Sequence, residues 1–409
     1  MQKLEDVAIH LKEVDKRVGK IDDFPYVQVN HIFDEEIVSF VKELSSAIRL
    51  NKYSKQYPDV MSFAFWCRQS NLKAIRERFS GESRLGRGLC FHIAPSNVPI
   101  TFAFSFIFSL LAGNSNIVRL PSQRFSQTEM LLEIIDNLFQ KYPDIEKSNL
   151  FCSFDKSNVE ASSSFSECSD CRVIWGGDST IEQFKNLKTK PRCVDICFPD
   201  RYSFAVIDAI AVANLSEEAL ARLAENFVND SYTMNQNACS SPHFITWLND
   251  DEKARNRFWS AVISVIDKKI QFSGSTSFEK YNNFCECAVN LNIQEFTQYK
   301  NLLYRMELKA LSSGLESYRC RDGAFFECSI SDISELFKVV NEKFQTLTYF
   351  GIDPKTIYYS MSKFNSLGID RIVPFGKALD MTSIWDGFDV IRDLSRIVYI
   401  ESYLRSLEI

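Results

Sequence analysis

The sequence lacks several features that by themselves would assign a protein to a functional class. Its 409 residues contain neither GxGxxG nor GxxxxGK followed by Ser or Thr, which excludes the two best-known phosphate-binding loops. Lys and Arg number 47 against 53 Asp and Glu, giving a net charge of −6. This balance lacks the basic excess that binding to a phosphate backbone requires, so we expect no nucleic-acid partner.

Long apolar segments are also absent. The longest apolar run, VPITFAFSFIFSLLA at 98–112, is shorter than the roughly 20 residues that cross a bilayer, and it predicts a buried helix and no membrane span. The first residues, MQKLEDVAIHLKEVDKR, are charged throughout and lack the apolar core and cleavage site of a secretory signal. We therefore expect a cytoplasmic protein, whose twelve cysteines are reduced thiols rather than a disulfide framework.

Metal-binding patterns are missing as well. Cys168 and Cys171 form a CxxC pair, and Cys285 and Cys287 form a CxC pair, but neither has a nearby histidine or a second pair at zinc spacing. The four histidines of the chain are scattered. We expect no metal site.

The residues that are present predict a soluble α/β protein. The chain is 45% hydrophobic and 13% aromatic, which is enough for a large core and, at this length, for two or three domains. Residues 1–84 show helical periodicity. From Gly86 short β-rich runs alternate with helical stretches, which predicts βαβ units in a parallel sheet with a nucleotide site at the carboxyl ends of its strands. These strands are expected at 89–94, 116–120, 150–154, 172–175 and 192–198.

A second α/β domain is expected after a further strand at 203–207. A helix at 216–230 leads to a segment around Cys239 and a strand at 242–247, and mixed elements continue to Gly376. We predict four parts in chain order: a helical segment that packs on the cofactor domain, a Rossmann-like cofactor domain, a catalytic domain and a C-terminal segment that packs back on the rest. Their boundaries, soft because no linker marks them, are 1–84, 85–207, 208–376 and 377–409.

The first expected strand runs into HIAPSNVP at 92–99. Pro99 suits the first position of a helix, and Ser96 or Asn97 suits its N-cap, so plain capping explains this turn. A functional alternative is that the Asn97 amide donates a hydrogen bond to a developing oxyanion.

The second expected strand, in AGNSNIVRLPSQR at 112–124, ends in Arg119, with Ser122 and Arg124 close behind. Charged residues just beyond a strand are usually solvated. The alternative is that they meet a phosphate of a dinucleotide, because a guanidinium pairs bidentately with phosphate.

A glycine pair follows the fourth expected strand, in VIWGGDSTIEQF at 173–184. Gly176 and Gly177 precede a helix whose cap would be Asp178 or Ser179. Glycines at such a turn let backbone N–H groups approach an anionic ligand. Alone, the pattern is not specific.

Cys239 lies in NDSYTMNQNACSSPHFITW at 229–247, between small polar residues and an expected strand. By composition a cysteine is more often an inert buried thiol than a nucleophile. The polar residues on both sides and the element boundary favour the nucleophile here.

Taken in order, these motifs resemble the aldehyde dehydrogenase superfamily, and more closely its LuxC-type long-chain acyl-CoA reductases. PSNVP at 95–99 resembles the turn whose asparagine lines the oxyanion hole, and GNSNIVRLPS at 113–122 resembles the strand that ends in a cofactor-contacting lysine, here Arg119. WGGD at 175–178 stands at the cofactor turn, and NQNACSSP at 235–242 stands at the nucleophilic cysteine. GIDRIVPFGKALDM at 368–381 and IWDGFDVIRDLSR at 384–396 resemble LuxC proteins in particular.

This resemblance implies an aldehyde dehydrogenase-like fold and reduction of a fatty acyl-CoA to an aldehyde through a thioacyl-enzyme on Cys239. Asn97 would serve the oxyanion, and Arg119, Ser122, Arg124, Gly176, Gly177 and Asp178 would contact NADPH. Aldehyde-oxidising members carry a glutamate near the fifth strand that activates water. Here PRCVDICFPDRYSFAVID offers only Asp195 and Asp200, so reduction of a thioester is favoured over hydrolytic oxidation.

Three alternatives stay open besides acyl-CoA reduction. They are aldehyde oxidation, a cofactor-independent acyltransferase that uses His243 as its base, and a non-catalytic scaffold of the same fold. The acyl donor could be CoA, a carrier protein or an acyl-protein synthetase partner, and we expect a homo-oligomer. The 34 phenylalanines fit an acyl tunnel and a large core equally well, and a core is the default interpretation.

Overall fold

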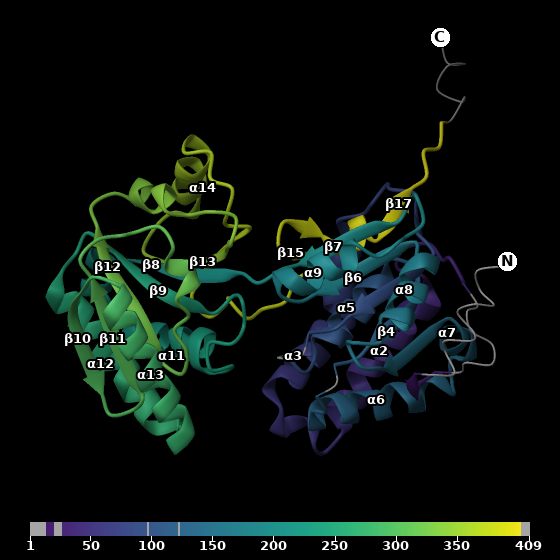
Figure 1. Cartoon of the computed structure of the whole chain (residues 1–409), viewed down its shortest axis with the longest axis horizontal. Coiled ribbons are helices and arrows are strands. Elements are labelled where there is room, and N and C mark those ends of the chain that lie inside the picture. Colours follow the sequence, from purple (N-terminus) through teal and green to yellow (C-terminus); the bar gives the residue numbers. More distant parts are fainter. Residues whose placement is uncertain (1–13, 20–26, 96–97, 122, 402–409) are drawn as a thin grey trace, which may run out of the picture. The chain divides into compact units, whose positions relative to one another are not determined.

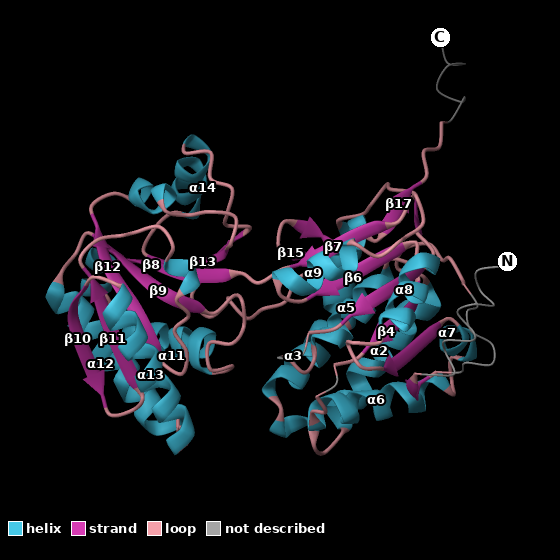
Figure 2. Cartoon of the chain, in the orientation of Figure 1, coloured by secondary structure: helices cyan, strands magenta, loops and turns pink. Residues whose placement is uncertain are grey.

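The computed structural model describes residues 14–19, 27–95, 98–121 and 123–401. The chain divides into two compact units, shown with their elements in Figure 1. Unit 1 comprises Met1–Pro199 and Met381–Ile409, and unit 2 comprises Asp200–Asp380. Each unit is built on one large sheet, and Figure 2 shows helices packed along both sheets.

Unit 1 contains a six-stranded sheet in the order β1-β5-β4-β3-β6-β7. The parallel strands start at β3 in the middle and move outward to β5, and the chain then returns to place β6 on the other side of β3, so the order reverses at the β3/β6 boundary. β3 to β7 pair in parallel, and β1 pairs antiparallel with β5. The bounds are β1 Asp15–Val18, β3 Leu89–Ile93, β4 Ser115–Arg119, β5 Asn149–Ser153, β6 Cys171–Trp175 and β7 Val194–Phe198.

The helix α5, Thr101–Leu111, is buried on every side. Its eleven residues are apolar all round, apart from small hydroxyl side chains, as expected for a helix in a core. Among the described residues no helix is both long enough and apolar enough to cross a membrane. The other helices that connect the strands are α6 Ser126–Phe139, α7 Pro143–Lys147, α8 Val159–Cys168 and α9 Asp178–Lys185.

The N-terminal helices and the C-terminal segment belong to unit 1. α2 begins after Asp34, whose carboxylate accepts hydrogen bonds from the first turn, and it packs against α5 and α6. The C-terminal β17 pairs antiparallel with β2. The strand β1 lies in a stretch that the periodicity assigned to helix, and its pairing with β5 explains the difference. The bounds are α2 Glu35–Leu50, α3 Pro58–Trp66, α4 Gln69–Glu77, β2 Arg84–Gly86, β15 Ile384–Trp385, β16 Phe388–Asp389, α15 Val390–Asp393 and β17 Ser395–Ile397.

Unit 2 contains a seven-stranded sheet in the order β10-β11-β12-β9-β8-β13-β14. Every neighbouring pair is parallel except β10 and β11. The bounds are β8 Tyr202–Asp208, β9 Pro242–Leu248, β10 Ile293–Tyr299, β11 Leu303–Leu308, β12 Ala324–Ile330, β13 Phe344–Phe350 and β14 Arg371–Pro374.

Both faces of this second sheet are covered. In β8, Phe204 and Val206 face one apolar cluster, while Ala205 and Ile207 face the other, which is the two-residue alternation of a strand buried on both sides. The α-helices of unit 2 are α10 Ala209–Ala213, α11 Glu217–Tyr232, α12 Glu252–Lys269, α13 Gly274–Asn290 and α14 Pro354–Lys363, and short 3-10 turns lie at Leu315–Ser317 and Ile333–Lys338. The prediction of two α/β parts with parallel sheets is confirmed.

The division into units differs from the expected boundaries at two places. β8 pairs with β9 and β13, so it lies in the sheet of unit 2 rather than in the cofactor domain that was expected to end at 207. At the other end, unit 2 extends to Asp380 instead of Gly376. An apolar strand fits either sheet by its own sequence, and only its distant pairing partners decide between them.

Candidate active site

Cys239 lies in the turn between α11 and β9, at the amino end of β9. β8 and β13 are the next strands of the sheet, and their amino ends are level with that of β9 because Ser203 pairs with Pro242 and Tyr202 with Phe344. The Ser203 hydroxyl donates to the carbonyl oxygen of Cys239 at 2.6 Å and accepts from the Thr346 N–H at 3.1 Å. One buried hydroxyl thus joins the starts of all three strands.

The sulfur of Cys239 contacts an amide. Gln345 at the start of β13 donates from Nε2 to Cys239 Sγ at 3.4 Å, and its side chain is completely buried. Cys239 itself is half-buried. The thiol is therefore contacted by a buried amide, in a residue that is itself partly exposed.

The turn that carries Cys239 has an unusual backbone. Asn235 and Gln236 have φ of 51° and 56°, a left-handed conformation that costs free energy for residues other than glycine. The buried Gln236 side chain offsets this cost with three hydrogen bonds. Its Nε2 donates to the Pro242 and Ala324 carbonyls at 3.1 and 2.9 Å, and its Oε1 accepts from Gly323 N–H at 2.8 Å.

A buried carboxylate connects the end of α11 to the segment after β14. Asp230 accepts hydrogen bonds from Gly376 N–H at 2.6 Å and Ala378 N–H at 3.0 Å. Burial is the main cause that raises its pKa to about 7, and the nearby Asp380 adds to the rise. The two N–H groups and the Arg371 guanidinium act in the opposite direction. PFGKAL at 374–379, one of the motifs behind the family resemblance, is thereby fixed against the helix that leads to Cys239.

His243 is poorly suited to the role of a general base. It is buried in β9, stacks on Tyr202 with 5.2 Å between ring centroids, and its Nδ1 lies 2.6 Å from the Cys320 carbonyl oxygen. Burial lowers its pKa to about 3, with Arg319 contributing. A general base works best with a pKa near the operating pH, so the geometry does not favour an acyltransferase that depends on His243.

In unit 1 Arg119 stands at the carboxyl end of β4. Its guanidinium lies over the Phe154 ring at 4.8 Å from the centroid and donates to the Phe154 carbonyl at 3.4 Å. Its buried Nε has no hydrogen-bond partner among the described residues, and burial lowers its pKa. Arg124 is exposed, with one nitrogen 3.7 Å from the Asp15 carboxylate. Ser122 lies outside the described residues.

The glycine pair lies at the carboxyl end of β6, next to β3, where the strand order reverses. α9 begins at Asp178 and has Gly177 as its N-cap, without a side-chain hydrogen bond to the cap. The sequence suggested Asp178 or Ser179 as the cap, and this prediction is wrong because Gly177 takes that position. A Cβ built on Gly177 meets no atom within 4 Å, so an approaching ligand has access to the backbone there.

Asn97 and Ser96 lie outside the described residues. The helix that follows them begins at Thr101 and has Ile100 at its N-cap. The simple capping explanation of the turn is therefore wrong, because the helix starts farther along the chain and Pro99 is not its first residue. The oxyanion role of Asn97 stays a prediction.

The two aspartates that could replace the missing glutamate are both ion-paired. Asp195 receives two hydrogen bonds from Arg172, at 2.8 and 2.6 Å. Asp200 lies 2.9 Å from the Arg319 guanidinium. Both carboxylates are therefore engaged by guanidinium groups.

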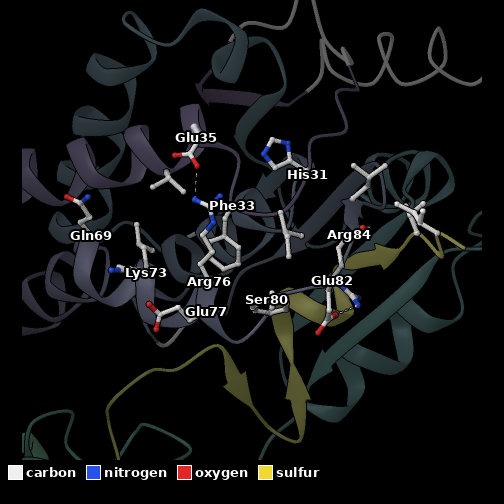
Figure 3. Close-up of a pocket in the computed structure, with 18 residues that line it drawn as sticks. His31, Phe33, Glu35, Gln69, Lys73, Arg76, Glu77, Ser80, Glu82 and Arg84 are labelled. Carbon is white, nitrogen blue, oxygen red and sulfur yellow. Dashed lines mark hydrogen bonds and ion pairs between the residues drawn. The ribbon is translucent and has the colours of Figure 1, made fainter. Parts of the chain in front are cut away.

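Unit 1 also contains a hollow of about 930 Å³, shown in Figure 3. Its apolar lining includes Phe33, Leu72 and Phe79. Three carboxylates and three Lys or Arg side chains lie among its lining residues, and Arg76 pairs with Glu35 at 2.7 Å. The charges balance, and none of the sequence-predicted site residues lines the hollow.

Comparison with known families identifies the chain. The model of the LuxC acyl-CoA reductases matches residues 68–397, most of the sequence. The chain belongs to the LuxC acyl-CoA reductase family. No curated protein matches the chain.

Solved structures show the fold of this LuxC-family chain. A mutant of Thermus thermophilus 1-pyrroline-5-carboxylate dehydrogenase is 11% identical over 97% of this chain and 95% of its own, with a TM-score of 0.66. A Thermus 1-pyrroline-5-carboxylate dehydrogenase with bound NAD is 10% identical over the same shares, with a TM-score of 0.63. Lactaldehyde dehydrogenase is 11% identical over 90% and 87%, also with a TM-score of 0.63. The fold is that of the aldehyde dehydrogenases.

Sequence reasoning missed the residues that hold Cys239. Ser203, Gln345 and Thr346 are polar and completely buried at the starts of otherwise apolar strands. Buried polar residues at strand ends are a signal of a site, but burial is not visible in one sequence. Gln236 and Asp230 lie in the segment that was singled out for its cysteine.

We expect Gln236→Leu to lower the free energy of unfolding by roughly 3 kcal/mol, because it leaves two carbonyls and one N–H without their buried partner. Denaturant titration of the variant measures this loss. Asn237→Ala, at an exposed position in the same turn, should change the free energy by less than about 0.5 kcal/mol. Equal losses in the two variants would contradict the scaffold role of Gln236.

Asp230 predicts a specific dependence of stability on pH. Its folded pKa of about 7 exceeds the ordinary value of 3.8, so the folded state binds its proton more tightly than the unfolded state. The resulting stability is complete below pH 3.8 and is lost as the pH rises through about 7. Thermal unfolding should therefore show wild type losing stability relative to Asp230→Asn from about pH 4 to about pH 7, with no further change above about pH 8. A stability difference between wild type and Asp230→Asn that does not change with pH would contradict the raised pKa of Asp230.

Proposed function

We propose that this chain reduces a fatty acyl-CoA, or a related long-chain acyl thioester, to the aldehyde with NADPH, through a thioacyl-enzyme on Cys239. The observation that carries the proposal is the placement of Cys239 in a chain of the LuxC acyl-CoA reductase family. Its carbonyl accepts a hydrogen bond from Ser203, and its sulfur accepts one from the amide of Gln345. A nucleophilic cysteine needs a thiol that is positioned and within reach of substrate, and Cys239 is hydrogen-bonded at its sulfur and only half-buried.

The first half of the reaction transfers the acyl group. The Cys239 thiolate attacks the thioester carbonyl, a C–S bond to the enzyme forms, the C–S bond to CoA breaks, and CoA leaves as a thiolate that takes up a proton. Negative charge develops on the carbonyl oxygen during the attack. We assign its stabilisation to the Asn97 amide and the Cys239 backbone N–H, the kind of preorganised donors that lower such barriers.

The second half releases the aldehyde. When bound, a reduced nicotinamide would supply a hydride, and hence two electrons, to the carbonyl carbon. Cys239 holds the acyl carbon in one position throughout, and the resulting thiohemiacetal collapses when its C–S bond breaks and the sulfur departs as a thiolate. With Asp195 and Asp200 engaged by arginines, the chain offers neither carboxylate as a free base for water.

Several features support a nicotinamide cofactor on unit 1. The exposed N–H groups at Gly177 and the unpartnered Nε of Arg119 lie at carboxyl ends of parallel strands, where such sheets bind dinucleotides. A structural neighbour from Thermus was solved with NAD. We favour NADPH because Arg119 and the exposed Arg124 offer positive charge to a 2′-phosphate.

Cys239→Ala should abolish covalent acylation, because no other side chain of the site provides the thiolate. Intact-protein mass spectrometry after incubation with acyl-CoA, without cofactor, measures the adduct. Cys285→Ala is the matched control, since Cys285 is the exposed cysteine of the chain and its loss should leave the adduct unchanged. Acylation of the Cys239→Ala protein at the wild-type rate would refute the assignment.

Arg119→Gln combined with Arg124→Ala should weaken NADPH binding by about tenfold or more and NADH binding much less, because the two guanidinium groups address the 2′-phosphate. Fluorescence titration with both cofactors measures the two affinities. Arg222→Ala, an exposed arginine on α11, controls for loss of positive charge. Equal affinity of the wild type for NADPH and NADH would rule out the preference.

A further inference from the structure

Gln345 presents an amide N–H, rather than a carbonyl oxygen, to the sulfur of Cys239. Arg371 Nη1 donates to Thr346 Oγ1 at 3.4 Å, and Thr346 Oγ1 in turn lies 3.2 Å from Gln345 Oε1. The Thr346 hydroxyl accepts from this guanidinium, which has only donors, and donates its own proton to Gln345 Oε1. With its oxygen bonded to Thr346, the amide presents Nε2 to the sulfur at 3.4 Å.

A β-bulge makes this chain of hydrogen bonds possible. Neighbouring residues of a regular strand point to opposite faces, yet the side chains of Gln345 and Thr346 bond to each other. The register between β13 and β8 shifts between Phe344 and Leu347, at these two residues. Bulges re-aim side chains in this way and are common beside active sites.

The series of hydrogen bonds starts at the Arg371 guanidinium, which is itself firmly held. Arg371 is buried, and its guanidinium donates to the carbonyls of Ala378 at 3.0 Å, Lys377 at 3.3 Å and Asp380 at 3.0 Å. Consecutive hydrogen bonds that start at a cation polarise one another in the same direction. Each bond toward Cys239 is therefore oriented to stabilise negative charge on its sulfur.

We propose that Gln345 is a catalytic residue of the reaction proposed above, on which this inference rests: its N–H stabilises the Cys239 thiolate, and as an amide it gives the thioacyl intermediate no base for hydrolysis. The thiolate is stabilised twice, when it attacks and when it departs from the thiohemiacetal. Between these two steps the thioester lies beside the Gln345 amide, which donates a hydrogen bond and accepts no proton at neutral pH.

A carboxylate in the same place would change the outcome. In Gln345→Glu the carboxylate can accept a proton from water, while the water oxygen bonds to the thioester carbon. The C–S bond then breaks, Cys239 leaves as a thiolate that recovers the proton, and a carboxylic acid is released. The overall step is hydrolysis, without oxidation or reduction.

The first experiment follows alkylation of Cys239 by iodoacetamide against pH, with the modified peptide identified by mass spectrometry. It needs neither acyl-CoA nor cofactor. Loss of a hydrogen bond to a charged sulfur should raise the midpoint of the profile by about one pH unit in Gln345→Met, and the added negative charge should raise it further in Gln345→Glu. Gln294→Glu, an exposed glutamine of β10, should leave it unchanged.

Thr346→Val tests the orientation of the Gln345 amide through the same alkylation midpoint. It keeps Gln345 but removes the hydroxyl that orients its amide, so the midpoint should rise by less than in Gln345→Met. A purely structural glutamine would leave the midpoint unchanged in every variant that folds. Unchanged midpoints in Gln345→Met and Thr346→Val would overturn the proposal.

The second experiment measures the lifetime of the thioacyl-enzyme after acyl-CoA is added without cofactor. The adduct should persist in wild type and Gln345→Met, whereas Gln345→Glu should release carboxylic acid over several turnovers. An adduct equally long-lived in Gln345→Glu would overturn the role against hydrolysis. Absence of any adduct on wild-type Cys239 would instead refute the proposed function, and the alkylation profile would still decide what the amide does to the thiol.

Discussion

The candidate site depends on one buried hydroxyl group, that of Ser203. It accepts from the Thr346 N–H and donates to the Cys239 carbonyl, so three strands that start far apart in the sequence begin at one level. A buried hydroxyl that makes both bonds avoids the desolvation cost of an unsatisfied polar group. The same contact fixes the backbone of Cys239 and sets β13 at the register where Gln345 reaches the sulfur.

Two buried ionisable residues of unit 2, Arg371 and Asp230, bind the segment that follows β14. Arg371 donates to three carbonyls of the segment after β14, and Asp230 accepts from two N–H groups of the same segment. Buried charges are costly unless they are fully hydrogen-bonded, and the pKa of Asp230, raised to about 7, shows that its two N–H bonds offset this cost only in part. The segment at 374–380 is thus fixed between a cation and a carboxylate, and the cation also begins the series of hydrogen bonds that ends at Cys239.

The polar groups around the candidate nucleophile and the fifth strand favour transfer of an acyl group over its hydrolysis. Gln345 supplies a donor without basicity, while Asp195 and Asp200 are held by arginine side chains. His243 is buried and has a pKa of about 3. The proposed protection of a thioester from water rests on these three features: an amide beside the sulfur, two ion-paired carboxylates and one buried histidine.

The sequence by itself determined the strands β3 to β9 to within two residues, the buried helix α5 and the identity of the family, because apolar periodicity and motif order are local properties. It also pointed to Cys239, through its polar neighbours. Only the tertiary structure decided that β8 belongs to unit 2 and that Gln345, 106 positions along the chain, meets the cysteine sulfur. Strand pairing and a β-bulge bring these residues together, and both depend on contacts between distant segments that no local pattern encodes.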